Sequence, residues 1–244
     1  MMLKNKRILV TGGTRGLGRA LVFRFAAEGA SVAACARSAD ALNRLELELR
    51  LRGARALALQ CDISDAEQVQ LFAKNVLEEF QGIDVIVNNA SLLGPRIEIV
   101  EITHPTWERV IDVNVNGLFY TTRAFLPSMI DQKSGSIINV TSSVGKIGKA
   151  RWGAYAVSKF ALEGFTQTLA DEVRSSHVRV NSVNPGAIAT EMRRAAYPNE
   201  DQGNLKSPEE ITDVFVYLAS DASLGITGQS FDAQHFKSHS KETV

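Results

Sequence analysis

The chain has 244 residues, and its 27 Lys and Arg residues balance 27 Asp and Glu residues, so the formal net charge is 27 − 27 = 0. Without an excess of positive charge there is no field to attract nucleic acid or an anionic membrane, and neither is expected as a partner. Apolar residues make up 45% of the chain and charged residues 22%, which argues against disorder, and two cysteines, Cys35 and Cys61, exclude a disulfide framework.

The first residues, 1–7, lead directly into an apolar segment and contain no signal-peptide core. No stretch of the sequence approaches 18 apolar residues, so no membrane-spanning helix is expected. We therefore expect a cytoplasmic protein. The four histidines are scattered without the spacing of metal ligands, and no metal is expected.

Short apolar segments alternate with longer amphipathic ones along the chain. The predicted strands are 8–10, 31–36, 56–59, 85–87, 136–140, 178–183 and 229–231. The predicted helices are 16–28, 40–52, 105–130, 152–174 and 208–219. A further helix is predicted to begin after Ser64 or Asp65, as its cap, and to end near Phe80. Strict alternation of the two kinds of element predicts a parallel sheet with helices on both faces.

The expected fold class is therefore α/β, a doubly wound parallel sheet of about seven strands with helices on both faces. No repeat or long linker divides the chain, so residues 1–244 are expected to form a single domain. The polar residues 197–204 are expected to form a surface loop, and the polar residues 237–244 a disordered tail.

A glycine-rich turn, residues 11–18, joins the first strand to the first helix. Such a turn at a helix N-terminus leaves free N–H groups and the positive end of the helix dipole facing one point, which favours a phosphate. The spacing G-x-x-x-G-x-G matches neither a Walker A loop nor the usual G-x-G-x-x-G. Its place after the first strand still indicates a nucleotide site, with candidate contacts Gly12, Thr14, Arg15, Gly16, Leu17 and Gly18.

The end of the second strand indicates which nucleotide is bound. A site for NAD normally has an acidic residue there, which binds the ribose 2′-hydroxyl, whereas this strand ends in Ala36-Arg37-Ser38. Arg37, together with Arg15, has the charge to pair with a 2′-phosphate. This favours NADP(H) as the cofactor, and the alternative is that Arg37 is a solvated loop charge.

Three side chains carry the expected chemistry. Tyr155 and Lys159 are four residues apart, so they share one face of a helix. Ser142 follows the fifth strand, at the edge where open α/β sheets place their sites. Ser143 competes with Ser142 for this role.

These motifs, in this order, resemble those of the short-chain dehydrogenase/reductase family over about residues 5–233, in a pattern closest to its 3-oxoacyl-carrier-protein reductases. Besides the three side chains, the resemblance rests on the 11–18 turn, Asn88-Asn89-Ala90, Asn114 and Asn184-Pro185-Gly186. It implies a Rossmann-type fold and hydride transfer between a nicotinamide and a carbonyl or alcohol. The thirteen-residue spacing to Tyr155 and the position of Gly145 favour Ser142 over Ser143.

Reducing a carbonyl needs a hydride on carbon and a proton on oxygen, and Tyr155 would supply the proton. A free phenol has a pKa of about 10. An ammonium group about 4 Å away is worth about 4 kcal/mol at an effective dielectric of about 20, which predicts that Lys159 brings the pKa of Tyr155 near 7. Ser142 would donate to the substrate oxygen as charge develops on it.

The resemblance implies the remaining roles. Lys159 would bind the nicotinamide ribose, and Asn114 would anchor a water that links Lys159 to solvent. Further cofactor contacts are implied for Asp62, Ile63, Asn89, Ala90, Tyr155, Lys159, Pro185, Gly186, Ile188 and Thr190. The chain departs from the family pattern at three places. Ser91 stands where glycine is usual, and Asp-Gly-Gly is lacking after Thr227-Gly228. Residues 190–208 are fewer than in many relatives, in which this region forms a helical lid.

We therefore expect an NADP(H)-dependent oxidoreductase that interconverts a small-molecule ketone or other carbonyl and a secondary alcohol. The alternatives are an NAD-linked dehydrogenase of a sugar, steroid or hydroxy acid and, in another class, a non-catalytic nucleotide-binding sensor. The apolar faces of helices 105–130 and 152–174 predict a homodimer or homotetramer. The identity of the substrate does not follow, because this fold and catalytic set serve many substrates.

Overall fold

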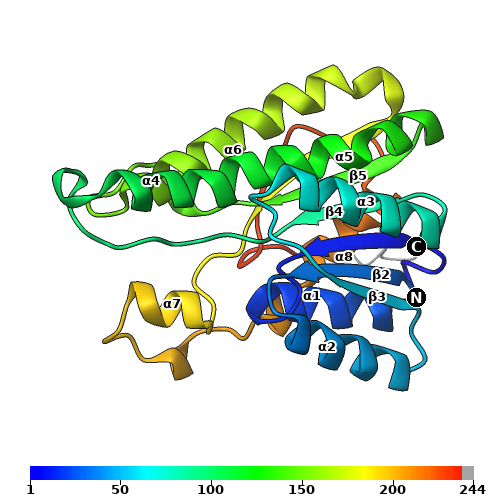
Figure 1. The fold of residues 1–244 in the computed structure, drawn as a ribbon, viewed down its shortest axis with the longest axis horizontal. Coiled ribbons are helices and arrows are strands. Elements are labelled where there is room, and N and C mark those ends of the chain that lie inside the picture. Colours follow the sequence, from blue (N-terminus) through cyan, green and yellow to red (C-terminus); the bar gives the residue numbers. More distant parts are fainter. Residues whose placement is uncertain (238–244) are drawn as a thin grey trace.

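The computed structural model describes residues 1–237 and contains a parallel sheet of seven strands in the order β3-β2-β1-β4-β5-β6-β7 (Figure 1). The strands are β1 (Arg7–Thr11), β2 (Ser31–Ala36), β3 (Ala56–Gln60), β4 (Val85–Asn88), β5 (Gly135–Val140), β6 (Val178–Asn184) and β7 (Ser230–Asp232). The predicted α/β fold with a doubly wound parallel sheet is confirmed. The tail predicted over 237–244 lies outside the described residues, apart from Lys237.

Helices cover both faces of the sheet (Figure 1). One layer contains α1 (Gly16–Ala27), α2 (Ala39–Leu51) and α8 (Asp213–Ala219), and the other α3 (Ala66–Phe80), α5 (Gly117–Gln132) and α6 (Gly153–Glu172). α4 (His104–Ile111) precedes α5, and α7 (Glu191–Ala196) lies beyond the ends of the strands. No helix within residues 1–237 has the length and hydropathy needed to cross a membrane.

Alternate residues of the central strand β1 pack against the two helical layers. In β1, Ile8 and Val10 pack into the core on the side of α1 and α8, and Leu9 packs into the core beside α3, α5 and α6. All three are completely buried. Burial of both faces explains why the strands read as uninterrupted apolar runs, and each such side chain contributes about 1.5–3 kcal/mol.

The direction of winding reverses between β1 and β4, which are neighbours in the sheet although β2 and β3 intervene in sequence. At this switch point the connections after the two strands leave in opposite directions, so a crevice opens at their carboxyl ends. The 11–18 turn follows β1 and Asn89 follows β4, so the fold brings these two predicted motifs to the same crevice.

Local hydrogen bonds decide where α3 begins. The Asp65 side chain accepts from the backbone N–H groups of Glu67 at 3.0 Å and Gln68 at 3.1 Å, which makes it the N-cap. Ser64 donates its hydroxyl to Asp62 at 2.7 Å instead. Of the two predicted caps, Asp65 is confirmed.

Two helices differ from their predicted extents. The helix predicted over 105–130 is interrupted by a π-helical turn, Asp112–Asn116, which separates α4 from α5. The helix predicted over 208–219 starts as the 3₁₀ turn Glu209–Ile211 and becomes α-helical only at Asp213.

Candidate active site

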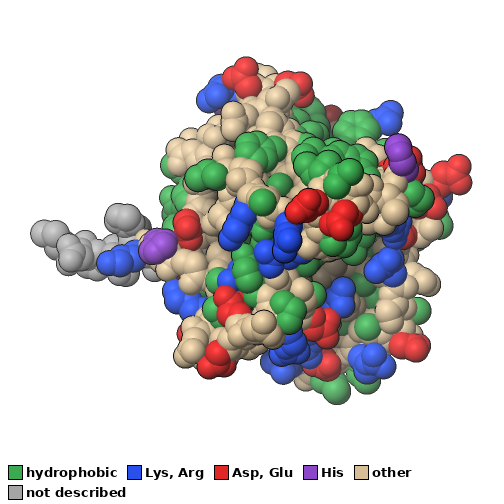
Figure 2. Space-filling view, turned by 90° about the vertical axis from the view of Figure 1, so that its left-hand side faces the viewer, with side chains coloured by type: hydrophobic (Ala, Val, Ile, Leu, Met, Phe, Trp, Pro, Cys, Tyr) green, Lys and Arg blue, Asp and Glu red, His purple; other side chains and the backbone are tan. Residues whose placement is uncertain are grey.

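The carboxyl ends of the strands border a cleft of about 1050 Å³. It opens on the face of the molecule seen in Figure 2, where basic side chains are spread over the middle of the surface. The cleft is lined by every predicted site residue except Asn114, namely Gly12, Thr14, Arg15, Gly16, Leu17, Gly18, Arg37, Asp62, Ile63, Asn89, Ala90, Ser142, Tyr155, Lys159, Pro185, Gly186, Ile188 and Thr190. The structure thus brings together residues from seven separate segments of the sequence.

Steric contact explains the glycines of the 11–18 turn. Gly12 has a φ of +68°, which side chains rarely adopt. A Cβ on Gly18 would lie 2.9 Å from the Gly12 carbonyl carbon and 2.6 Å from Asn89 Nδ2, closer than van der Waals contact allows. Asn89 braces the turn by donating to the carbonyls of Thr11 at 2.9 Å and Gly12 at 3.3 Å. The turn and the segment after β4 therefore form one rigid cradle.

The two arginines predicted to meet a 2′-phosphate differ in their surroundings. Arg15 forms an ion pair with Glu191 of α7 at 2.8 Å, with both side chains more than 70% exposed, so this pair contributes little stability. Arg37 lies at the surface of the cleft, and among residues 1–237 only its backbone carbonyl is hydrogen-bonded to a side chain, by Gln60 Nε2 at 2.9 Å. The guanidinium of Arg37 is therefore free to bind an anion.

The Asp62 carboxylate is held in a fixed position beside the cleft. One oxygen accepts from the backbone and hydroxyl of Ser64, and the other from Arg109 of α4 at 2.9 Å. Burial opposes ionisation, but the hydrogen bonds from Ser64 and Arg109 prevail and lower the pKa of Asp62 to about 2. The carboxylate is thus charged and orientated at neutral pH.

Tyr155 and Lys159 lie at the floor of the cleft. Both are buried, at 8% and 3% exposure. The ammonium of Lys159 donates to the carbonyl oxygen of Val140, the last residue of β5, at 2.8 Å and lies 5.5 Å from the centre of the Tyr155 ring. Ser142 follows two residues after Val140 and lines the same part of the cleft. The predicted trio therefore converges on one point.

The predicted acidity of Tyr155 is wrong for the protein alone. Burial raises the pKa of Tyr155 to about 12, against an opposing hydrogen bond with Ser142. Burial also lowers the pKa of Lys159 to about 8, against the charge of Glu163, which raises it. The cost of desolvating both groups thus outweighs the attraction between phenolate and ammonium.

Asn114 lies behind the cleft rather than on its surface. It sits in the π-helical turn, is 3% exposed, and its side chain exchanges hydrogen bonds with the backbone of Leu92 at 2.7 and 2.9 Å. Its amide also donates to Ser158 at 2.9 Å, and Ser158 donates to the carbonyl of Tyr155 at 2.7 Å. Asn114 thereby ties the loop after β4 to the helix that carries Tyr155.

An aromatic wall consists of Trp152 and Tyr155, which line the cleft, and Tyr197, which packs against them. The ring of Trp152 lies 5.7 Å from that of Tyr155 and 6.0 Å from that of Tyr197. Arg96, from the loop after β4, stacks on Trp152 at 4.8 Å and on Tyr197 at 4.5 Å, and donates to the carbonyl of Ala196. Trp152 thus both lines the cleft and packs against its aromatic neighbours.

Sequence reasoning missed α7 and Arg96. α7 is a short helix in the segment expected to be a shortened lid, and Met192, Ala195 and Ala196 from it line the cleft. Its end is held by Arg193, which pairs with Glu200 and stacks on Tyr197 at 3.9 Å. No sequence signal marks Arg96, because its partners come from distant segments.

Replacing Arg96 with methionine is expected to release α7. The substitution removes the cation–π contacts with Trp152 and Tyr197 and the hydrogen bond to Ala196. These interactions together stabilise the observed position of α7 by about 1–2 kcal/mol. Tryptic cleavage after Arg193 and Arg194 should become about 10-fold faster. Arg174→Met, which removes only a surface pair with Asp171, should leave the rate unchanged, and an unchanged rate in Arg96→Met would contradict this role.

The departures from the family pattern are accommodated locally. Ser91 lines the cleft, and its hydroxyl is buried with no hydrogen-bond partner among the described residues. In place of the missing Asp-Gly-Gly, Gln234 donates to the carbonyls of Pro185 at 2.8 Å and Ala187 at 3.2 Å. Gln234 thereby stabilises the loop that follows β6. No group of three or more potential metal ligands occurs within residues 1–237.

The profile of the short chain dehydrogenase family matches residues 6–201. The chain belongs to this family. It is 37% identical over 236 residues to the uncharacterized oxidoreductase YciK of Escherichia coli K12, covering 96% of this chain and 93% of that protein. It is 36% identical over 237 residues to the 3-oxoacyl-[acyl-carrier-protein] reductase FabG of Thermotoga maritima, covering 94% and 96%.

A crystal structure of a short chain dehydrogenase from Shigella flexneri 2a, complexed with NADP, superposes with a TM-score of 0.92 at 37% identity. The match covers 96% of this chain and 98% of that one. The resemblance inferred from the motifs is thus confirmed, and the chain is an oxidoreductase of the short chain dehydrogenase family.

Proposed function

We propose that the protein is an NADP(H)-dependent reductase that interconverts a carbonyl compound and a secondary alcohol, with Tyr155 as the proton donor and acceptor. The observation that carries this proposal is the convergence of Ser142, Tyr155 and Lys159 on a nucleotide-sized cleft. The structural relative that holds NADP supports the choice of cofactor.

The residues of the cleft fit NADP(H). The cradle at Gly12 and Gly18, where a Cβ has no space, leaves room for the backbone to approach a pyrophosphate at the start of α1. Arg37 offers a free guanidinium for the 2′-phosphate. Asp62 would contact the adenine and Ile63 its ring, with Asn89 and Ala90 at the ribose.

Side chains of the protein itself carry out the proton transfer to the carbonyl oxygen. Bound NADPH supplies the hydride to the carbonyl carbon. Tyr155 donates its proton to the carbonyl oxygen, and the Ser142 hydroxyl hydrogen-bonds the same oxygen as negative charge develops there. Lys159 stabilises the resulting phenolate across the 5.5 Å to the ring. Because burial raises the pKa of Tyr155 to about 12, the residue is fully protonated at neutral pH, which suits the direction of reduction.

Asn114 would complete the site by anchoring a water between Lys159 and solvent, and Pro185, Gly186, Ile188 and Thr190 would meet the nicotinamide. The proposal includes a homodimer or homotetramer that acts on a small molecule. The exposed apolar side chains Phe119 of α5 and Val157 and Phe160 of α6 are 43%, 46% and 45% exposed and offer a surface for such pairing.

The direct test is a panel of ketones and acyl thioesters, scored by consumption of NADPH at 340 nm. We expect at least one class to be reduced. If NADPH binds and no member of the panel is reduced, the non-catalytic sensor becomes the better assignment.

Replacing Arg37 with alanine is expected to weaken NADPH binding by about 10- to 100-fold, because a charge-assisted bond to the 2′-phosphate is worth about 1.5–3 kcal/mol. Binding of NADH, which lacks this phosphate, should not change. Fluorescence titration with each nucleotide measures both. Arg44→Ala removes an exposed arginine of α2 outside the cleft and serves as the control. Equal loss for NADPH and NADH would favour the NAD-linked alternative.

A further inference from the structure

The inner face of α6 carries three functional groups one helical turn apart. Tyr155, Lys159 and Glu163 follow at intervals of four residues, and Glu163, like the other two, is buried, at 8% exposure. A buried carboxylate is costly unless it has partners or a charge to neutralise. The mechanism above gives Glu163 no part.

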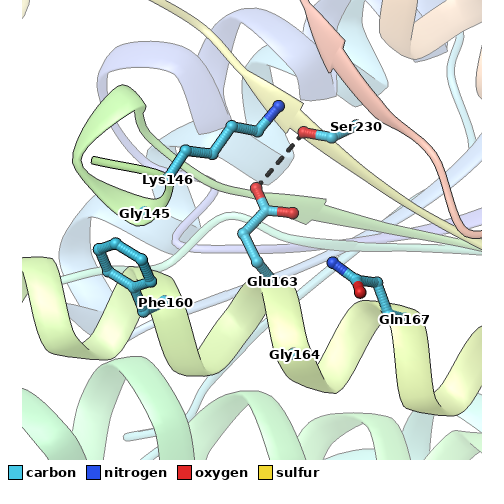
Figure 3. Close-up of a pocket in the computed structure, with 7 residues that line it drawn as sticks. All are labelled: Gly145, Lys146, Phe160, Glu163, Gly164, Gln167 and Ser230. Carbon is cyan, nitrogen blue, oxygen red and sulfur yellow. Dashed lines mark hydrogen bonds between the residues drawn. The ribbon is translucent and has the colours of Figure 1, made fainter. Parts of the chain in front are cut away.

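Glu163 is held by the two strands at the edge of the sheet. One oxygen accepts from the hydroxyl of Ser182 in β6 at 2.9 Å. The other accepts from the hydroxyl of Ser230 in β7 at 3.4 Å, the bond drawn in Figure 3. Lys159 is held by β5 through Val140. The Glu163 carboxylate and the Lys159 ammonium are thus hydrogen-bonded to different strands and do not contact each other. Their charges therefore interact electrostatically across the gap between them.

A second cavity, of about 510 Å³, reaches Glu163 from outside the nucleotide cleft. Its lining includes Lys146, Gln167 and Ser230, and Figure 3 shows Glu163 between the helix and Ser230. The two cavities have no lining residue in common. Lys159 therefore lines the nucleotide cleft, whereas Glu163 lines the second cavity.

The charges around this pair are few. Among the described residues that line the second cavity, Lys146 and Glu163 alone are charged. The other elements that pack against α6 carry ionisable groups that already have partners or lie toward solvent. They are His104, Glu108 and Arg109 with Asp62 on α4, Asp112 with Asn116 in the π-helical turn, Arg174 with Asp171, and Arg179 of β6, which donates to the carbonyls of Leu218 and Ser220. Glu163 is thus the counter-charge available to Lys159.

We propose that Glu163 is a positioning residue that keeps Lys159 positively charged beneath the cofactor. This rests on the proposed function, in which the ammonium of Lys159 binds the nicotinamide ribose and stabilises the Tyr155 phenolate. Glu163 lies one helical turn from Lys159, and its charge raises the pKa of the ammonium. At an effective dielectric of about 20, a charge at such a spacing is worth about one pKa unit or more. Burial lowers the pKa of Lys159 to about 8 even with this charge in place. Without this charge, the pKa of Lys159 would be lower still.

The test is Glu163→Gln, which keeps the shape and removes the charge. NADPH affinity is measured by fluorescence from pH 6 to pH 9.5. The wild-type affinity should begin to fall near pH 8, and in the variant the fall should begin about one pH unit lower, with equal affinity at pH 6. The alkaline limb of kcat/KM for carbonyl reduction should move by the same amount.

Two variants separate charge from structure. Ser230→Ala removes a hydrogen bond to Glu163 but keeps the charge, and Glu163→Asp keeps the charge on a shorter side chain. Both should retain the wild-type pH dependence. An unshifted titration in Glu163→Gln, or loss of NADPH binding at pH 6 in both the Gln and the Asp variants, overturns the proposal. Because binding needs no turnover, a failed substrate panel would count against the proposed function and leave this test intact.

Discussion

Replacing Tyr155 with phenylalanine is expected to lower kcat/KM for carbonyl reduction by about 1000-fold, because it removes the proton donor. The change deletes one hydroxyl and keeps the ring, which packs on Trp152 at 5.7 Å. Folding and NADPH affinity should therefore stay close to those of the wild type. Steady-state kinetics with the best substrate of the panel, together with NADPH titration, measures both.

The matched control is Tyr197→Phe. Tyr197 belongs to the same aromatic wall, but its hydroxyl accepts a bond from Lys149 at 3.4 Å on the outside of the molecule. Its loss should change kcat/KM by less than about threefold. Turnover by Tyr155→Phe at more than about a tenth of the wild-type rate would remove Tyr155 from the mechanism.

Replacing Gly18 with alanine is expected to abolish tight NADPH binding, with an affinity loss of about 100-fold or more. The new methyl group would overlap the Gly12 peptide and displace Asn89 Nδ2, which lies 2.6 Å from the Cβ position. The turn would have to open, at a cost of about 1–3 kcal/mol in stability as well. Calorimetric titration with NADPH and thermal unfolding measure the two effects.

Gly164→Ala is the control for this change. Gly164 lies in α6, and a Cβ there meets no atom within 4 Å. Alanine is the better helix former by about 1 kcal/mol, so this variant should be equally or more stable and bind NADPH normally. Normal NADPH affinity in Gly18→Ala would show that the 11–18 turn is not the phosphate site.

The positions of the strands and their parallel arrangement follow from the sequence because burial on both faces favours short apolar runs, whereas the order of the strands was not predicted. β2 begins and ends where its apolar run does, at Ser31 and Ala36. The meeting of the 11–18 turn with Ser142, Tyr155 and Lys159 at one cleft was also predictable. These residues lie at fixed offsets from strand ends or within one helix, so that spacing alone brings them together.

Features that depend on tertiary contacts were not predictable. α7 has only six residues and no apolar periodicity, and its end is stabilised by Arg193 through Glu200 and Tyr197. The pKa of Tyr155 depends on how deeply the fold buries it, and the four-residue spacing to Lys159 contains no information on burial. The four-residue spacing also could not show that the Lys159 ammonium donates a hydrogen bond to the carbonyl of Val140.

The π-helical turn at Asp112–Asn116 also determines how many residues are needed between α4 and α5. Such a turn holds one residue more than the α-helical turn it replaces, and this surplus is absorbed locally. Loss of one residue there would restore a continuous helix, keep the flanking helices in phase and carry the Asn114 amide away from Leu92 and Ser158. The protein would then retain its architecture but lose the asparagine that ties the loop after β4 to α6.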